Sequence, residues 1–218
     1  MTTGSRIGLL GGTFDPIHLG HLAAAHAADQ VLRFDRLLFI PSNAPPHRPD
    51  SPRASGYHRL RMTALAVAGI PGWEASNVEL ARGGASYTFD TLTALREHEP
   101  ASQFFFITGA DAFAEIATWR RHAELLELAH FVVIARPGTS FDRIRARLPQ
   151  LAPRMVACDV SSPSACRAAP FPSIFLINAD TPDVSSTEVR RRAATGGPLA
   201  GLVPDAVANY IAEHHLYA

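Results

Sequence analysis

Residues 11–21 read Gly11-Gly12-Thr13-Phe14-Asp15-Pro16-Ile17-His18-Leu19-Gly20-His21. The apolar run at 7–10 before them predicts a buried strand, the paired glycines predict a tight turn, and a helix is expected from Leu19 onward. His18 and His21 then share one face at the start of that helix. A helix N-terminus carries free backbone N–H groups and positive potential, so this stretch is typical of a phosphate-binding site.

Short apolar runs alternate with longer amphipathic segments along the chain. Strands are expected at 7–10, 36–40, 104–108, 131–134, 154–156 and 174–177, with a weaker one at 73–78. Helices are expected at 19–32, 56–67, 88–98, 140–148, 186–195 and 204–214, with a broken stretch over 111–128. This alternation, with strands apolar on both faces, predicts an α/β fold with a doubly wound parallel sheet. Ligands in such sheets bind at the carboxyl ends of the strands, where the strand order reverses.

Length and charge narrow the class of protein. The 218 residues fit one domain, 1–218, with a small helical subregion at about 185–218. Twenty basic residues balance twenty acidic ones, which argues against a nucleic-acid binder or a polybasic membrane-surface protein. No apolar run reaches the ~20 residues of a membrane span, and residues 1–6 do not resemble a signal peptide. A cytoplasmic protein is therefore expected.

Two residue types narrow the chemistry further. All 20 basic residues are arginine, which excludes a Walker-A lysine and a Schiff-base lysine. Cys158 and Cys166 are the only cysteines, and their spacing is not that of a Cys-x-x-Cys motif. We expect both to be reduced thiols.

The histidine pair has three interpretations. A lone histidine is most often structural, but a pair that opens a helix after Gly-Gly favours phosphate, because imidazole N–H groups can donate to phosphate oxygens. Gly20 leaves room for a nucleotide to approach the backbone. Zinc would need further ligands, and no His-Glu-x-x-His motif supplies them. A zinc hydrolase built on His18, His21 and His47 stays as an alternative.

A second motif lies near the end of the chain. Residues 184–190 read Val184-Ser185-Ser186-Thr187-Glu188-Val189-Arg190. Ser185 and Glu188 fit a capping box, which predicts a helix start. The hydroxyls and free amides there would also make an oxygen-binding surface. The three arginines at 190–192 point about 100° apart, so at most two can face a ligand; in the plainer interpretation they form a solvated basic face.

Together the two motifs carry a resemblance. The first matches Gly-Gly-(Thr/Ser)-Phe-Asp-Pro-x-His-x-Gly-His, and the second matches Ile-Ser-Ser-Thr-x-Ile-Arg with valine at 184 and 189. The chain resembles the bacterial nicotinate-mononucleotide adenylyltransferases of the His-x-Gly-His nucleotidyltransferase superfamily along essentially its whole length. Further blocks similar to that family stand between the motifs in the same order, at 41–48, 86–92, 106–111 and Trp119. The resemblance implies a Rossmann-like nucleotidyltransferase fold.

The resemblance also implies a reaction and its residues. The reaction is transfer of the adenylyl group of ATP to nicotinate mononucleotide, giving nicotinate adenine dinucleotide and pyrophosphate in NAD biosynthesis. The implied catalytic residues are His18, His21, Arg48 and Arg190. The implied ATP-binding residues are Gly11, Gly12, Thr13, Phe14, His18, Gly20, His21, Gly109, Asp111, Ser186, Thr187 and Arg190. The implied nicotinate-mononucleotide-binding residues are Arg48, Tyr87, Thr88, Asp111 and Trp119.

The middle blocks suit those roles. Thr88 is expected to be the N-cap of a helix whose free amides receive the pyridine carboxylate. Trp119 would stack on the pyridine ring, and Asp111 would accept hydrogen bonds from ribose hydroxyls. Arg48 stands where the family commonly has lysine, which keeps the charge but changes its geometry.

Partners and cofactors follow from the same reasoning. The expected partners are ATP and nicotinate mononucleotide, with no nucleic acid and no membrane, and a homo-oligomer is compatible with the sequence. Mg²⁺ is expected to arrive with ATP, because no dedicated metal ligands stand out. Two alternatives stay open: a sibling adenylyltransferase acting on nicotinamide mononucleotide or phosphopantetheine, and a non-catalytic nucleotide-binding protein.

Overall fold

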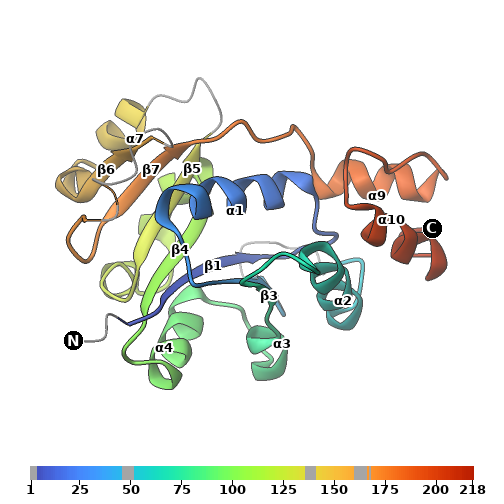
Figure 1. Cartoon of the computed structure of the whole chain (residues 1–218), viewed down its shortest axis with the longest axis horizontal. Coiled ribbons are helices and arrows are strands. Elements are labelled where there is room, and N and C mark those ends of the chain that lie inside the picture. The colour runs from blue at the N-terminus through green and yellow to red at the C-terminus, as the bar shows by residue number, and fades with distance from the viewer. Residues whose placement is uncertain (1–3, 46–51, 136–140, 160–165, 167) are drawn as a thin grey trace. The chain divides into compact units, whose positions relative to one another are not determined.

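The computed structural model describes residues 4–45, 52–135, 141–159, 166 and 168–218 (Figure 1). Its strands are β1 (Arg6–Gly12), β2 (Arg36–Pro41), β3 (Trp73–Ala75), β4 (Gln103–Gly109), β5 (His130–Ala135), β6 (Met155–Cys158) and β7 (Ile174–Asn178). Its α-helices are α1 (Leu19–Leu32), α2 (Gly56–Val67), α3 (Val78–Arg82), α4 (Thr88–His98), α5 (Ala110–Ala114), α6 (His122–Leu125), α7 (Phe141–Arg147), α9 (Ser186–Ala194) and α10 (Asp205–Glu213). Two 3-10 helices are η1 (Ile116–Thr118) and η2 (Pro149–Arg154).

The strands form one sheet in the order β3-β2-β1-β4-β5-β7-β6. β1 pairs with β4 in parallel register, with Leu10 opposite Ile107, and the pairs β4–β5, β5–β7 and β6–β7 are parallel as well. The order reverses between β1 and β4, since the chain passes from β1 to β2 on one side and continues from β4 on the other. The predicted doubly wound α/β class is confirmed.

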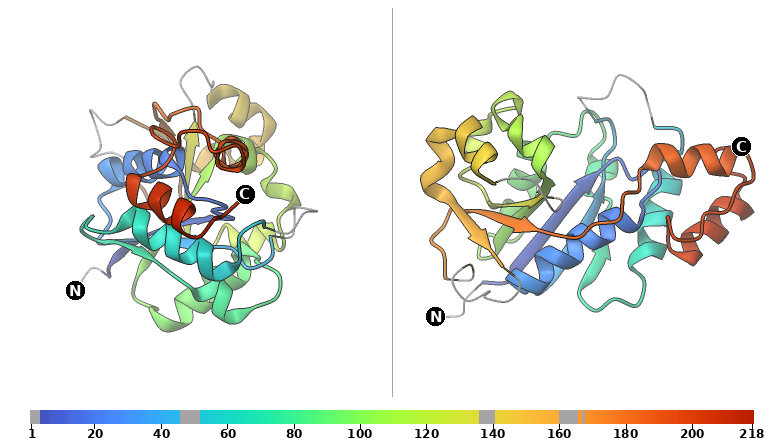
Figure 2. Two further views of the ribbon diagram at one scale, coloured as in Figure 1. Left: turned by 90° about the vertical axis from the view of Figure 1, so that its right-hand side faces the viewer. Right: turned by 90° about the horizontal axis from the view of Figure 1, so that it is seen from above.

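The chain divides into two compact units. Unit 1 comprises Met1–Leu10, Ala24–Leu37 and Tyr87–Asp180, and unit 2 comprises Gly11–Ala23, Leu38–Ser86 and Thr181–Ala218. In unit 1, α5 packs against β4, β5 and α7, and α4 packs against α6. In unit 2, α2 packs against α10 (Figure 2). The expectation of a single domain over 1–218 stays a prediction.

Most predicted elements agree with the structure to within two residues, and one differs in type. The weak strand expected at 73–78 is the short β3 followed by α3, because Asn77 begins a helix that runs from Val78 to Arg82. The strand expected at 154–156 starts one residue later, because Pro149 opens the turn η2 and Arg154 ends it. Among the described residues, no helix has both the length and the apolar character needed to cross a membrane.

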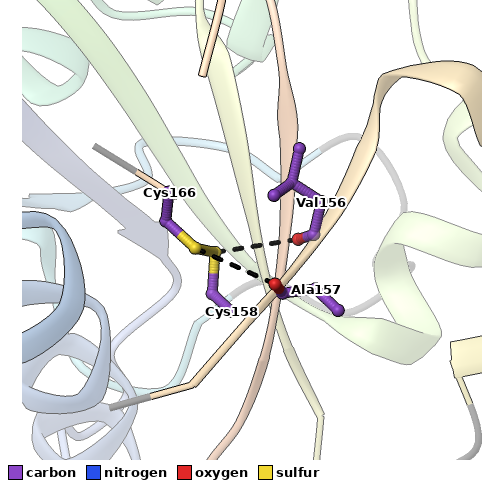
Figure 3. The surroundings of a disulfide bond; sticks show 4 residues. All are labelled: Val156, Ala157, Cys158 and Cys166. Atoms are coloured by element: carbon purple, nitrogen blue, oxygen red, sulfur yellow. Dashed lines mark hydrogen bonds between the residues drawn. A yellow bond between two sulfur atoms is a disulfide. The ribbon is translucent and has the colours of Figure 1, made fainter. Parts of the chain in front are cut away.

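The expected free thiols at Cys158 and Cys166 are a disulfide in the structure (Figure 3). β6 ends at Cys158, and the Cα atom of Cys166 lies 6.0 Å from that of Cys158, which suits a disulfide. The expectation was wrong because the spacing of two cysteines along the sequence does not determine their distance in the fold.

His130 opens β5 as a buried histidine, with 3% of its surface exposed. Its Nδ1 accepts a hydrogen bond from the Ser173 N–H at 3.1 Å, and its ring stacks on Phe105 with centroids 4.6 Å apart. Burial, reinforced by the nearby charge of Arg6, lowers the pKa of His130 to about 4. The imidazole is therefore neutral in the folded protein at pH 7.

Replacing His130 should make stability less dependent on pH. Between the unfolded pKa of about 6.5 and the folded pKa of about 4, the unfolded chain binds the extra proton. This histidine therefore lowers the free energy of unfolding as the pH falls, by at most about 1.4 kcal/mol per pH unit. His130→Asn keeps an acceptor for Ser173, so the slope measured by urea unfolding between pH 4 and 6.5 should become shallower. The same substitution at the exposed His98 is the control, and an equal change in both variants would contradict the prediction.

Candidate functional site

The turn between β1 and α1, residues 13–18, belongs to unit 2 and is held by neighbouring backbone. The Ser42 N–H donates to the Gly12 carbonyl at 2.8 Å, which joins the start of the turn to the segment after β2. Phe14 adopts a left-handed φ of 47° and is buried. Its ring meets the His21 ring edge to face, with centroids 5.0 Å apart. The turn is therefore packed on its apolar side and leads directly into the histidine pair.

His18 and His21 cap the first turn of α1. The His18 carbonyl accepts from the His21 N–H at 3.0 Å, and the His18 N–H donates to Nδ1 of His21 at 3.2 Å. His21 stands three residues after the N-cap, where a capping box places its acceptor side chain. Because Nδ1 of His21 accepts, its ring proton lies on Nε2, which is thereby a donor. The two rings stack with centroids 3.6 Å apart and planes 25° apart.

His18 is neutral at physiological pH. Only 8% of its surface is exposed, and burial lowers its pKa to about 4. Its buried Nδ1 has no hydrogen-bond partner among the described residues. The pair therefore does not carry a double positive charge, and it would meet phosphate oxygens through ring N–H groups. A bound polyanion would raise the pKa of His18 again.

Gly20 is needed for this stacking. A Cβ at position 20 would lie 3.1 Å from Nδ1 of His18 and 3.4 Å from the Pro182 carbonyl oxygen. The first of these contacts is tighter than ordinary packing, so the His18 ring would have to shift by a few tenths of an ångström, whereas the second is an ordinary van der Waals contact. Gly20, which was predicted to let a nucleotide approach the backbone, thus also makes room for the His18 ring.

Asp15 ties four segments of unit 2 together. Its carboxylate is 4% exposed and accepts from the Arg53 N–H at 2.8 Å and the Ala54 N–H at 3.0 Å, on the segment that precedes α2. The Tyr217 hydroxyl donates to Oδ1 at 2.8 Å. The Asp15 carbonyl accepts from Nη1 of Arg190 at 2.7 Å, and that nitrogen lies 3.8 Å from Oδ2. The turn is therefore held by contacts from the Leu38–Ser86 part and from the Thr181–Ala218 part of unit 2.

Arg59 provides a second anchor from α2. It is 2% exposed, and its guanidinium donates to the carbonyls of Thr13 at 2.8 Å, Ser42 at 2.6 Å and Ala54 at 3.2 Å. Burial lowers its pKa, and the charge of Asp15 opposes that shift. The guanidinium stays charged because its ordinary pKa lies far above neutrality. One buried cation thus joins the turn of residues 13–18, the segment after β2 and the start of α2.

The motif near the C-terminus meets the first motif. Ser185 caps α9 through its side chain, accepting from the Glu188 N–H at 3.2 Å. The Ser186 hydroxyl donates to the Pro16 carbonyl at 2.9 Å, and Thr187 Oγ1 accepts from Arg190 at 3.2 Å. Arg190 alone of the three arginines reaches the turn. Arg191 and Arg192 both bind the carboxylate of Glu188.

The remaining predicted residues lie in unit 1. Gly109 ends β4 and Asp111 lies exposed in the first turn of α5. Thr88 is not the N-cap that was expected. Tyr87 holds that position, in extended conformation, and its carbonyl accepts from the Thr91 N–H at 3.2 Å. With Tyr87 as its N-cap, α4 begins at Thr88. A cap at Thr88 would have made the helix begin one residue later.

Trp119 packs on β4, and the residue after it contacts the start of α4. Its half-buried ring meets Phe106 edge to face, with centroids 5.9 Å apart. The next residue, Arg120, places its guanidinium 4.7 Å from the Tyr87 ring centroid and 2.9 Å from Asp90 Oδ2. Tyr87 and Trp119, predicted for the same substrate, thus come from neighbouring elements. Their roles stay predictions.

Two of the predicted residues lie outside the part of the chain that the structure describes. They are Arg48 and, in the zinc alternative, His47. Within the part of the chain that the structure describes, no group of three or more His, Cys, Asp or Glu side chains is placed to hold a metal ion.

Comparison with known proteins identifies relatives of the chain. Residues 9–192 match the cytidylyltransferase-like family. A "probable nicotinate-nucleotide adenylyltransferase" of Frankia alni is 41% identical over 208 residues, which cover 95% of this chain and 98% of the relative. A protein of the same name from Symbiobacterium thermophilum is 40% identical and covers 98% of this chain and 95% of its own length. The chain belongs to the nicotinate-nucleotide adenylyltransferase family.

The fold of this adenylyltransferase family extends to distant members. The nicotinic acid mononucleotide adenylyltransferase of Plasmodium falciparum, solved with NaAD, superposes with a TM-score of 0.72 at 19% identity, covering 98% of this chain and 97% of that chain. The same enzyme solved with APC gives a TM-score of 0.70 with the same coverage and identity.

Sequence reasoning missed two anchors of this family member, Arg59 and Tyr217. Arg59 was detectable, because it falls on the apolar stripe of α2 together with the buried Met62, Thr63 and Ala66. An arginine on such a stripe is buried only when its donors find partners. Tyr217 carried no comparable signal, since it follows α10 in a segment without periodicity.

Proposed function

We propose that this chain transfers the adenylyl group of ATP to nicotinate mononucleotide, releasing pyrophosphate. The observation that carries the proposal is the junction of the two motifs in unit 2, where Ser186 and Arg190 bind the turn that leads to His18. Membership of the adenylyltransferase family supports the same reaction. Nucleotide substrates also suit the ring N–H donors and the nearby guanidinium of Arg190.

The chemistry needs no general base. The phosphate oxygen of nicotinate mononucleotide is already an anion at neutral pH, and it attacks the α-phosphorus of ATP. The bond from that phosphorus to the bridging oxygen breaks, and pyrophosphate leaves with the electron pair. The barrier comes from repulsion between polyanions and from charge growing on the leaving group. The protein therefore acts by holding the phosphates in line and stabilising that charge.

Each residue has a proposed part in this step. The Nε2–H of His21 and the His18 ring donate to oxygens of the transferred phosphate. Arg190, positioned by Thr187, supplies positive charge beside them. Arg48 would add a second cation from the 41–48 segment. Mg²⁺ enters bound to the phosphates of ATP and so belongs to the substrate.

The acceptor is set by proposed contacts in unit 1. The backbone amides at the start of α4, next to Tyr87 and Thr88, favour a carboxylate over a neutral carboxamide. Trp119 offers a flat face for the pyridine ring. Asp111 and Gly109, which follow β4, would take up the ribose.

Nicotinate mononucleotide should therefore be used better than nicotinamide mononucleotide. The carboxamide presents N–H donors to amides that are themselves donors, so kcat/KM for the amide substrate should be lower by about tenfold or more. Release of pyrophosphate from ATP, measured with each acceptor at equal concentration, tests this. Equal kcat/KM values for the two mononucleotides would contradict the proposed selectivity. They would favour a sibling adenylyltransferase that acts on nicotinamide mononucleotide.

The same assay tests the reaction itself. Label from the α-phosphate of ATP should appear in a dinucleotide only when the mononucleotide is present. No turnover with any mononucleotide, together with tight ATP binding, would favour a nucleotide-binding protein without catalysis.

A further inference from the structure

The chain folds back on itself after α10 through a Schellman motif. The His215 N–H donates to the Ala212 carbonyl at 3.2 Å. The Leu216 N–H donates to the Ile211 carbonyl at 3.0 Å. His215, between them, lies in the left-handed region with a φ of 48°. These are the two hydrogen bonds that close a helix in this motif, and they turn the last residues back toward the body of unit 2.

Tyr217 also has a left-handed backbone, with a φ of 72°. A bulky side chain rarely adopts this conformation, because its Cβ atom then crowds the neighbouring backbone carbonyl. Such an outlier persists when contacts elsewhere hold it in place. The contact here is the hydrogen bond of the Tyr217 hydroxyl to Oδ1 of Asp15, at 2.8 Å across 202 residues of sequence.

The tyrosine hydroxyl is a dependable donor. Burial raises the pKa of Tyr217, and the charge of Asp15 raises it further. The phenol thus keeps its proton over the whole range in which the protein is handled. Among the described residues it provides the one side-chain hydrogen bond to the Asp15 carboxylate, since Arg53 and Ala54 donate through their backbone.

Asp15 lies in the turn that sets the position of the histidines. Two residues separate it from His18, and its own carbonyl is held by Arg190. Its carboxylate is therefore bound from the α2 side by backbone, and from the chain end by Tyr217. Loss of the phenol oxygen would leave Oδ1 with the Ala54 N–H alone.

We propose that Tyr217 is a positioning residue for the transfer reaction, holding through Asp15 the turn of residues 13–18 that presents His18 and His21 to the phosphates. The proposal rests on the proposed function for what the turn does, and on the hydrogen bond itself for how the turn is held. Tyr217 thereby affects the rate of the reaction without touching the substrate.

Tyr217→Phe tests the proposal because it removes one oxygen and keeps the ring. Tyr210→Phe is the matched control, because that hydroxyl bonds Nδ1 of His58 at 2.9 Å and has no contact with Asp15. Four quantities should be measured in both variants and the wild type: kcat, KM for ATP, Tm, and the hydrogen-exchange rates of the backbone amides of residues 13–18.

In Tyr217→Phe we expect kcat to fall about tenfold, with KM for ATP within about threefold of wild type. Amide exchange should speed up in residues 13–18 while the rest of unit 2 is unchanged. Tyr210→Phe should match the wild type in kcat and in exchange of that turn.

Unchanged kcat and unchanged exchange in Tyr217→Phe would overturn the proposal. Faster exchange across all of unit 2 with unchanged kcat would also overturn it, because the tyrosine would then only stabilise the fold. If the wild-type chain shows no turnover, the proposed function fails, and the exchange comparison still decides whether Tyr217 holds the turn.

Discussion

His21→Asn should lower kcat about 100-fold or more while leaving stability nearly unchanged. The asparagine side-chain oxygen can take the place of Nδ1 and accept from the His18 N–H, so the cap at the start of α1 is kept. The Nε2–H that would meet the transferred phosphate is lost. The barrier should therefore rise by about 3 kcal/mol, the usual effect of removing one such donor. Steady-state kinetics of pyrophosphate release and a thermal melt measure the two effects separately.

His21→Ala and His26→Asn complete the design. His21→Ala removes both the cap and the donor, so it should lose activity and also some stability, about 1 kcal/mol. His26 lies exposed further along α1, and its substitution should leave kcat as it is. If His21→Asn keeps full kcat, His21 does not act on the phosphate.

Arg59→Met should destabilise the protein by about 3–5 kcal/mol, the usual result of breaking a buried charge network. The change leaves the carbonyls of Thr13 and Ser42 without the donor that now joins them. It also removes the charge that faces the buried carboxylate of Asp15. Methionine fills a similar volume, so lost hydrogen bonds and charge dominate over a cavity. Urea unfolding at pH 7 gives the change in free energy.

Arg61→Met is the control for Arg59, because it lies on the same helix with an exposed side chain. Its effect should stay within about 0.5 kcal/mol. Similar losses in the two variants would show that the buried guanidinium does not join the three segments.

Much of the fold followed from local patterns in the sequence. α1, α2 and α4 begin and end where the periodicity predicts, at Leu19–Leu32, Gly56–Val67 and Thr88–His98, although the N-cap of α4 is Tyr87 and not Thr88. Buried strands such as β5 stand out because a parallel strand covered on both faces is an unbroken apolar run. Ser185 identified the start of α9 because capping acts within one turn of helix.

What the sequence concealed depends on contacts between distant segments. The bond between Asp15 and Tyr217 crosses 202 residues, and no local rule reports it. The neutral state of His18 comes from its burial by the surrounding chain, which lowers its pKa, and no local pattern in the sequence reports that burial. The disulfide between Cys158 and Cys166 likewise depends on the distance between the two cysteines in the fold, which their spacing in the sequence does not give.

A crystal structure with a non-hydrolysable ATP analogue and Mg²⁺ tests most directly whether the turn after β1 and the start of α9 hold the triphosphate. We predict phosphate oxygens within about 3 Å of a ring nitrogen of His21 and of the Arg190 guanidinium, the distance of a hydrogen bond. A triphosphate bound elsewhere, with His18 and His21 still stacked and free of phosphate contacts, would contradict the assignment of these residues to adenylyl transfer.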